Sequence, residues 1–190
     1  EVTPPGFELI AVDNASTDGT SEYLDDLALK KGSLKVIHSK SNLGFAKGNN
    51  LALKQAKNPF ILYLNNDTLP QWGWLEQMVD VLEGNKKAGI VGARLYFPQS
   101  SDGRWYIQHA GKELVHGTPT HIGRNKEDVV VANRGVEEVE LVTGACMLVR
   151  RDLAKFNEKF ERGYYEDDDM CLGARIKGFR VYINHDSKLI

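Results

Sequence analysis

The sequence is poor in cysteine, has no excess of basic residues and contains no long hydrophobic segment. Its 190 residues include two cysteines, Cys146 and Cys171, which argues against a disulfide scaffold and fits a reducing compartment. Its 24 basic and 26 acidic residues give a formal net charge of -2, so the electrostatic footprint of a nucleic-acid binder is missing. The longest apolar runs are about as long as residues 60–64. They fall well short of the ~18 residues that a membrane span needs. We therefore expect one globular domain over residues 1–190.

Several common catalytic motifs are also missing. The sequence contains no GxSxG, P-loop or GxGxxG pattern. It therefore gives no support to a serine hydrolase with a nucleophile elbow, a nucleotide triphosphatase or a dinucleotide-binding enzyme. His109, His116, His121 and His185 have no Cys or His partner at zinc spacing, and we interpret them as loop or surface residues.

Short apolar runs alternate with helical patterns in the first half of the chain. Strands are predicted over residues 7–12, 34–38, 60–64 and 88–95, and helices over residues 20–31, 45–57 and 72–83. This order predicts an α/β fold with a mostly parallel central sheet and helices on both faces. Ligands bind beyond the carboxyl ends of such strands, so we expect a site in the loops after Val12, His38 and Leu64.

The pattern weakens between residue 98 and about residue 135, a stretch rich in Gly, His, Asn and charge. A connection of this length without its own elements is typical of a functional or mobile loop. Beyond it, strand pieces are predicted at 138–142 and 146–149, a helix at 166–177 and a late strand at 180–183.

The first polar cluster, residues 13–19, directly follows the first predicted strand. Its short acceptor and hydroxyl side chains suit a base and ribose, and the helix N-terminus that follows favours an anion. The same residues are typical of a plain turn and helix cap. A calcium loop starting at Asn14 fits the spacing of Ser16, Asp18 and Asp25, but the preceding strand and the Asp at its twelfth position argue against it.

Two further clusters are acidic. Residues 65–68, Asn-Asn-Asp-Thr, follow the strand at 60–64; they suit a hard divalent cation that takes its other ligands from phosphates, and a turn explains them equally well. Residues 164–169 place two tyrosines before four consecutive acids. Acids in a first helical turn interact favourably with the helix dipole, but this cluster exceeds what a cap requires. We expect repulsion to raise the pKa of at least one of the four acids.

Taken in order, these clusters resemble the GT-A fold of family 2 glycosyltransferases, the inverting enzymes that use nucleotide-diphosphate sugars. The matching stretches are residues 7–20, 42–50, 64–68, 143–147 with Arg150 and Arg151, 165–172 and 178–181. The Asn-rich first and third stretches resemble rhamnosyltransferase-like members of cell-surface polysaccharide assembly. Similar proteins have a further strand before Glu1 and continue past Ile190 to a histidine that can complete the metal site. The resemblance thus implies a domain truncated at both ends.

The resemblance also implies residue roles. The nucleotide-sugar is expected to contact Asp13, Asn14, Ser16, Lys47, Asn50, Asn65, Asn66 and Gly144. Asp67 is expected to bind Mg2+ or Mn2+ that bridges the diphosphate, although Asn65 replaces the first acid of the family's DXD motif. Asp167 is the expected general base, and Glu166 and Trp105 are expected on the acceptor side, with simple loop packing an equal alternative for Trp105. The nucleotide-binding half spans about 1–97, and the acceptor and catalytic half about 98–190.

The implied partners are a UDP- or dTDP-linked sugar and a glycan or lipid-linked acceptor, with no nucleic acid. The expected location is the cytoplasm, including the inner face of the membrane. A strand edge exposed by truncation favours a homo-oligomer. Two alternatives stay open: a non-catalytic sugar-nucleotide or glycan-binding module, and a sugar-phosphate nucleotidyltransferase, which lacks the support of a glycine- and basic-rich triphosphate loop near the start.

Overall fold

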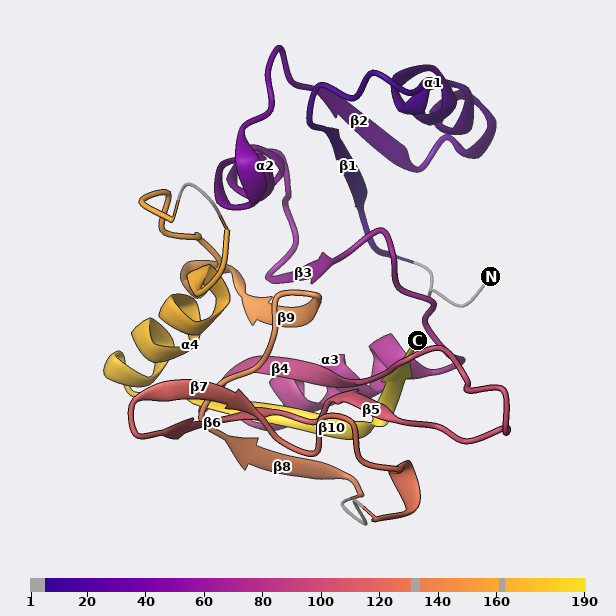
Figure 1. Ribbon diagram of the computed structural model, residues 1–190. Helices are drawn as coiled ribbons and strands as arrows, with labels where there is room; N and C mark the ends of the chain where they lie inside the picture. Colours follow the sequence, from indigo (N-terminus) through magenta and orange to yellow (C-terminus); the bar gives the residue numbers. More distant parts are fainter. Residues whose placement is uncertain (1–5, 131–133, 161–162) are drawn as a thin grey trace.

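The computed structural model describes residues 6–130, 134–160 and 163–190 (Figure 1). The elements in chain order are β1 (Leu9–Asp13), α1 (Thr20–Lys31), β2 (Leu34–His38), α2 (Gly44–Leu53), β3 (Phe60–Leu64), α3 (Trp74–Gly84), β4 (Ala88–Tyr96), β5 (Ile107–His109), β6 (Lys112–Val115), β7 (Thr118–His121), η1 (Asp128–Val130), β8 (Val136–Val139), β9 (Cys146–Arg150), η2 (Arg151–Leu153), α4 (Glu166–Ile176) and β10 (Arg180–Leu189). The predicted bounds of α1, β2 and β3 are confirmed to the residue. None of the helices in the described ranges is both long and apolar enough to cross a bilayer.

The main sheet has the strand order β3-β9-β4-β10-β8, and β5 pairs with β4. Strand β10 is parallel to β4, whereas β9 is antiparallel to both β3 and β4, and β8 is antiparallel to β10. The α/β class is therefore confirmed, but the prediction of a mostly parallel sheet is wrong. The strand–helix–strand order correctly predicts that β3 and β4 are parallel to each other. It does not predict that β9, from the second half of the chain, lies between them.

Strands β1 and β2 form a separate parallel pair, in register from Leu9 with Leu34 to Asp13 with His38. In Figure 1 this pair lies with α1 and α2 above the main sheet. The strands β1, β2, β3 and β4, predicted to share one central sheet, are thus divided between two sheets. Within the described ranges no strand pairs with both β1 and β3, so the β1–β2 pair is not joined to the main sheet by a strand.

Side chains of the main sheet alternate between two cores, as the pleat requires. Ile61, Ile90, Met147 and Ile183 point to the core that α2 and α4 cover, while their neighbours along the strands pack against α3. All nine residues of β4 are buried, because both of its faces are covered. Helices on both faces of the sheet are therefore confirmed.

The segment from 98 to 135 is not the structureless loop that the sequence predicts. Strands β6 and β7 form a hairpin. The N–H of Lys112 donates to the Leu141 carbonyl over 2.8 Å, and the N–H of Leu141 donates to the Lys112 carbonyl over 3.2 Å. His109 and Ala110 are buried. Strands of three or four residues are too short to produce a clear alternating pattern.

Candidate active site

Four segments that carry predicted site residues meet around Gly144. The N–H of Asn65, just after β3, donates to the carbonyl of Ala145 over 2.9 Å. The N–H of Gly144 donates to Oδ2 of Asp167, at the start of α4, over 2.9 Å. A Cβ on Gly144 would lie 3.4 Å from both Asp167 Cβ and Phe45 Cζ. The absence of a side chain thus lets the starts of α2 and α4 approach the same piece of backbone.

Asn14 joins the loop after β1 to the start of α2. Its Oδ1 accepts from the N–H of Leu43 over 2.8 Å, and its Nδ2 donates to the Gly44 carbonyl over 3.3 Å and to Asn42 Oδ1 over 3.0 Å. A Cβ on Gly48 would lie 3.7 Å from Nδ2 of Asn14, so the helix packs closely on this loop. The first polar cluster is thereby held beside the segments that meet at Gly144.

Asp13 organises the loop from inside. Its carboxylate accepts from the N–H of Ser16 over 3.0 Å and from the hydroxyl of Ser21, and its Oδ2 lies 3.2 Å from Nδ1 of His38. These hydrogen bonds, that from Ser21 first, hold the pKa of Asp13 well below its usual value. Asp13 is 3% exposed, whereas Ser16 is exposed. Contact of Asp13 with a nucleotide stays a prediction, and Ser16 offers the accessible hydroxyl.

The alternative of a calcium loop gains no support, because its two carboxylates each bind a neighbouring side chain and the described residues hold no cluster of three metal-ligating side chains. Oδ1 of Asp18 accepts from the N–H and hydroxyl of Thr20 over 3.2 and 2.6 Å, which satisfies the start of α1. Oδ1 of Asp25 lies 2.9 Å from Nε2 of His38, and Asp25 first and Asp13 second raise the pKa of that imidazole. The turn interpretation therefore accounts for Asp18.

Lys47 and Asn50 lie on α2. Lys47 is half-buried. The Asn50 side chain is buried; it accepts from the N–H of Phe156 and donates to the carbonyl of the same residue, both over 2.9 Å, and it also donates to Glu158 Oε1. Both ends of this amide thus attach the 156–158 segment to α2. A contact of Asn50 with the nucleotide-sugar stays a prediction.

The segment from Asn65 to Thr68 is a turn that leaves a carboxylate in solvent. The hydroxyl of Thr68 donates to the Asn65 carbonyl over 2.8 Å, and Asn66 and Asp67 are exposed. Among the described residues no three His, Cys, Asp or Glu side chains converge as a metal cage. One exposed carboxylate with neighbouring amide oxygens nevertheless fits Mg2+ or Mn2+, hard ions that take further oxygen ligands from phosphates and water.

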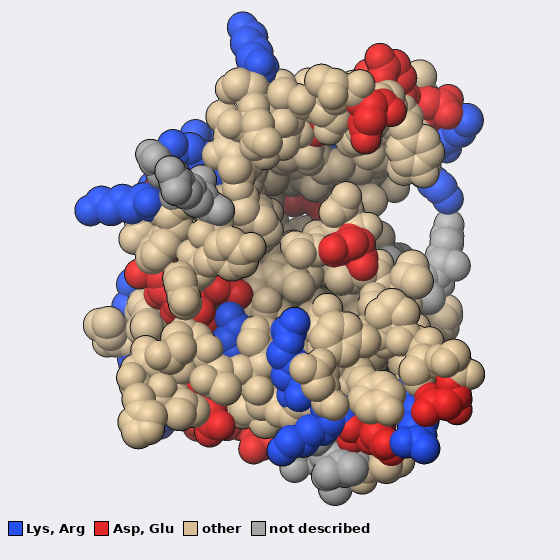
Figure 2. Space-filling model, in the orientation of Figure 1, with Lys and Arg blue, Asp and Glu red and all other residues tan. Residues whose placement is uncertain are grey.

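The acidic turn of α4 is largely buried. Glu166, Asp167 and Asp168 are 7%, 9% and 5% exposed, whereas Asp169 is exposed. Figure 2 shows acidic side chains over α4, beside a hollow between the upper layer of β1, β2, α1 and α2 and the main sheet. Burial raises the pKa of Glu166 and of Asp168, and the charge of Asp167 adds a smaller effect. The expected upward shift is confirmed, but desolvation rather than repulsion is its main cause.

Lys112 is the one residue of this cluster that the sequence analysis missed. Its Nζ donates to Oδ2 of Asp167 over 3.1 Å and to Oδ1 of Asp168 over 2.7 Å. Burial alone would lower the pKa of the Lys112 ammonium, but the two carboxylates outweigh it and raise that pKa. A lysine in a supposed loop carries no local signal of burial. Residues 112–115, Lys-Glu-Leu-Val, do not alternate between polar and apolar side chains, so the sequence gives no strand signal there either.

Trp105 is half-buried and packs against a small core. Its ring meets that of Tyr96 edge to face, with centroids 5.8 Å apart, and it adjoins the small core of Ile107 and Ala110. This accounts for the packing alternative. A contact with an acceptor stays a prediction.

The prediction of surface histidines is wrong for His109 and His185, which are fully buried. Nδ1 of His109 lies 3.0 Å from Nδ1 of His121, and Nε2 of His185 lies 3.1 Å from Glu137 Oε2. Burial lowers the pKa of His121 to about 4, and it also lowers the pKa of His109 well below its usual value. The two paired histidines are therefore neutral near pH 7.

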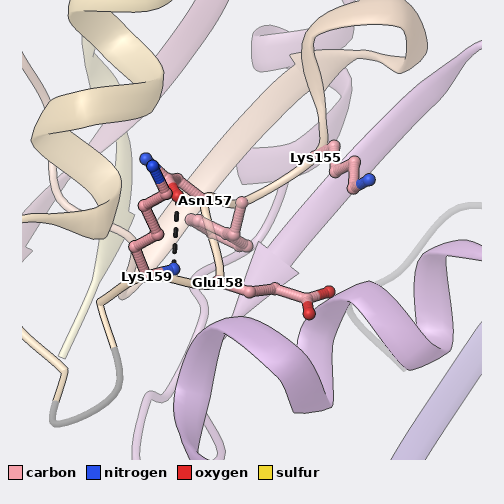
Figure 3. Close-up of a pocket in the computed structure, with 5 residues that line it drawn as sticks. Lys155, Asn157, Glu158 and Lys159 are labelled. Carbon is pink, nitrogen blue, oxygen red and sulfur yellow. Dashed lines mark hydrogen bonds between the residues drawn. The ribbon is translucent and has the colours of Figure 1, made fainter.

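A second hollow adjoins the segment that Asn50 binds. It is lined by residues 155–159, with Glu158 beside α2 (Figure 3). No predicted site residue lines it. The candidate active site is therefore the convergence at Gly144.

Comparison with solved structures shows the fold. Among solved structures, "Crystal structure of GalNAc-T7 with UDP, GalNAc and Mn2+" superposes with a TM-score of 0.76 at 13% identity, covering 96% of this chain and 37% of that one. The Staphylococcus aureus TarS 1-349 complex with UDP gives 0.62 at 19% identity, covering 96% and 50%. These likenesses confirm the GT-A fold.

Curated relatives are longer proteins. The chain is 29% identical over 185 residues to the uncharacterized protein y4gI of Sinorhizobium fredii, and 29% identical over 201 residues to the O-antigen biosynthesis protein RfbC of Myxococcus xanthus. These alignments cover 91% and 98% of this chain but 20% and 15% of the relatives, so the chain spans a fifth or less of their length. Residues 1–156 match the family described as "Glycosyl transferase family 2". The chain therefore belongs to glycosyl transferase family 2.

Proposed function

We propose that this chain is the donor-binding and catalytic domain of an inverting glycosyltransferase that moves a sugar from a UDP- or dTDP-linked donor to an acceptor hydroxyl. The observation that carries the proposal is the convergence at Gly144 of Asp167 and the turn that bears Asp67. The loop that bears Asn14 and Ser16 is joined to the same place through the start of α2. A base, a diphosphate-binding turn and a polar nucleotide loop then border one space.

The donor would lie across the loops after β1 and β3. Ser16 and the half-buried Asn14 offer polar groups for the base and ribose, and Asn65 and Asn66 offer amides for the sugar phosphate. Asp67 would hold Mg2+ or Mn2+ against the diphosphate. When bound, the ion neutralises the charge that develops on the leaving diphosphate. Two structural neighbours support this assignment, because they were solved with UDP, GalNAc and Mn2+ and with GDP-Man and Mn2+.

Asp167 would act as the general base. It takes the proton of the acceptor hydroxyl while that oxygen forms a bond to the anomeric carbon of the donor. The bond from this carbon to the phosphate oxygen breaks on the opposite face, and the nucleotide diphosphate leaves with the electron pair, so the configuration inverts. A positioned base contributes about 10²–10⁴-fold to such a step. Glu166, buried beside Asp167, would border the acceptor.

The name of the Myxococcus relative supports an acceptor in polysaccharide synthesis, a glycan or lipid-linked sugar. Within that class we retain a rhamnosyl donor as one member of the test panel. The cytoplasmic location of the transfer and a homo-oligomeric state belong to the same proposal.

A panel of nucleotide sugars screened by thermal shift with Mn2+ tests the proposal. A ligand at a hundredfold excess over its Kd stabilises the folded state by about 2.7 kcal/mol, which raises the Tm of a domain of this size by about 5–10 °C. The products then separate the alternatives. Release of nucleotide diphosphate from the nucleotide sugar indicates transfer, release of pyrophosphate from a nucleoside triphosphate incubated with a sugar 1-phosphate indicates a nucleotidyltransferase, and binding without turnover indicates a non-catalytic module. No shift with any nucleotide sugar contradicts the proposal.

A further inference from the structure

Lys112 places a positive charge inside the acidic turn of α4. It is 6% exposed, and its Nζ lies 3.1 Å from Asp167 Oδ2 and 2.7 Å from Asp168 Oδ1. A buried ammonium is retained only when it is paired and hydrogen-bonded. Here both partners belong to one helical turn, and one of them is the proposed base.

The backbone around Lys112 is built to bring this side chain to α4. The residue exchanges two backbone hydrogen bonds with Leu141, just before the 143–145 segment. The preceding Gly111 has a φ of +97°, and a Cβ there would lie 2.8 Å from Val139 Cγ1. Any other residue at position 111 would be strained and would push β6 away from Val139. The place of Lys112 is therefore fixed from two sides.

The hydrogen bonds of Asp167 distinguish its two oxygens. Oδ2 accepts from Gly144 N over 2.9 Å and from Lys112 Nζ over 3.1 Å. Oδ1 accepts from the N–H of Asp168 over 2.9 Å. Each carboxylate oxygen offers about two acceptor positions, so Oδ2 is saturated and Oδ1 retains one free position.

We infer that Lys112 is a positioning residue for the transfer reaction: with Gly144 it holds Oδ2 of Asp167, so that Oδ1 is the atom that takes the proton of the acceptor hydroxyl. This inference rests on the proposed function, since it specifies how the base works. The charges of Lys112 and Asp167 act on Glu166 and Asp168 of α4 and on His121 of β7. With His121 neutral near pH 7, Lys112 is the cation that orients the base.

The test compares Lys112→Met with Lys126→Met, the same chemical change at an exposed position of the same segment. With the donor identified in the nucleotide-sugar panel, Lys112→Met is expected to lower kcat at least tenfold, because a misaligned base loses much of its effect. The KM for the donor and the Kd for UDP with Mn2+ stay within twofold of the wild-type values, since Lys112 acts on the base alone. Lys126→Met keeps all three constants.

A charge-balanced variant covers the case in which Lys112→Met does not fold. Lys112→Met/Asp168→Asn removes one cation and one carboxylate, so the buried net charge stays that of the wild type. It is expected to bind UDP with Mn2+ normally and still to show a kcat at least tenfold low. A wild-type kcat in either variant, or an equal loss of UDP binding, overturns the role of Lys112 while the wild-type enzyme remains active. Absence of turnover by the wild-type chain with every donor instead contradicts the proposed function, and with it this role.

Discussion

The backbone N–H of Gly144 donates a hydrogen bond to Oδ2 of Asp167 over 2.9 Å, across 23 positions of sequence. Its neighbour Ala145 accepts from the N–H of Asn65, at the turn that carries Asp67. The 143–145 segment thus contacts the proposed base on one side and the proposed diphosphate turn on the other. Four predictions follow from this geometry and from the charges around it.

Enlarging Gly144 is expected to disturb the base in proportion to the volume added. Gly144→Ala places a methyl group 3.4 Å from Asp167 and Phe45, which a small shift accommodates. Gly144→Val adds two further carbons and is expected to lower kcat by about 10–100-fold, because small displacements of a catalytic group are costly. Steady-state kinetics, with circular dichroism as the folding control, measures both. Equal activity of Gly144→Val and the wild type contradicts a positioning role for this contact.

Asp67→Ala is expected to abolish Mn2+-dependent binding of UDP. The side chain is exposed and is the acidic residue of its turn, so the fold does not depend on it. Asp80→Ala, an exposed Asp on α3, is the matched control and should bind as the wild type does. Isothermal calorimetry with and without Mn2+ makes the comparison. Unchanged Mn2+-dependent affinity in Asp67→Ala shows that the ion is held elsewhere.

The buried pair of His109 and His121 is expected to make the protein acid-sensitive. The pKa of His121 is lowered to about 4 in the folded state, against about 6.5 when unfolded. The unfolded chain therefore binds the proton first, and stability is lost as pH falls from 6.5 toward 4. The full shift corresponds to about 3.4 kcal/mol at 1.36 kcal/mol per pKa unit, and solvent screening at the partly exposed His121 ring keeps the loss below this ceiling.

Urea unfolding at pH 7, 6 and 5 measures this effect. His121→Gln should show a flatter dependence of the free energy of unfolding on pH than the wild type. The comparison removes the opposite contribution of His38, whose raised pKa adds stability below pH 6.5 that is lost as pH rises. Parallel pH dependences in the two proteins contradict the assignment to His121.

The sequence alone predicts those elements whose ends are determined by neighbouring residues. Helix α1 ends where Gly32 adopts a left-handed φ of 64°, and β3 is a short apolar run before a polar turn; both were predicted. The turns that carry Asn14, Asp67 and Asp167 were located by the same local patterns. These signals reside in consecutive residues, so no long-range information was needed.

Long-range pairing could not be predicted in this way. Strand β9 lies between β3 and β4 because of backbone hydrogen bonds to segments more than 50 positions away. Lys112 reaches Asp167 from a hairpin whose strands are four residues long. The buried amide of Asn50 is used by Phe156, 106 positions away. None of these relationships leaves a periodic or compositional trace in the sequence.

The central claim is that Asp167 removes the proton from the attacking hydroxyl, and the most direct test is the transfer rate of Asp167→Asn at saturating donor. Asp169→Asn, an exposed acid two positions away in the same turn, is the control. We predict that Asp167→Asn binds UDP with Mn2+ within twofold of the wild type but transfers sugar about 10²–10⁴-fold more slowly, while Asp169→Asn transfers normally. Full transfer activity in Asp167→Asn would contradict the account.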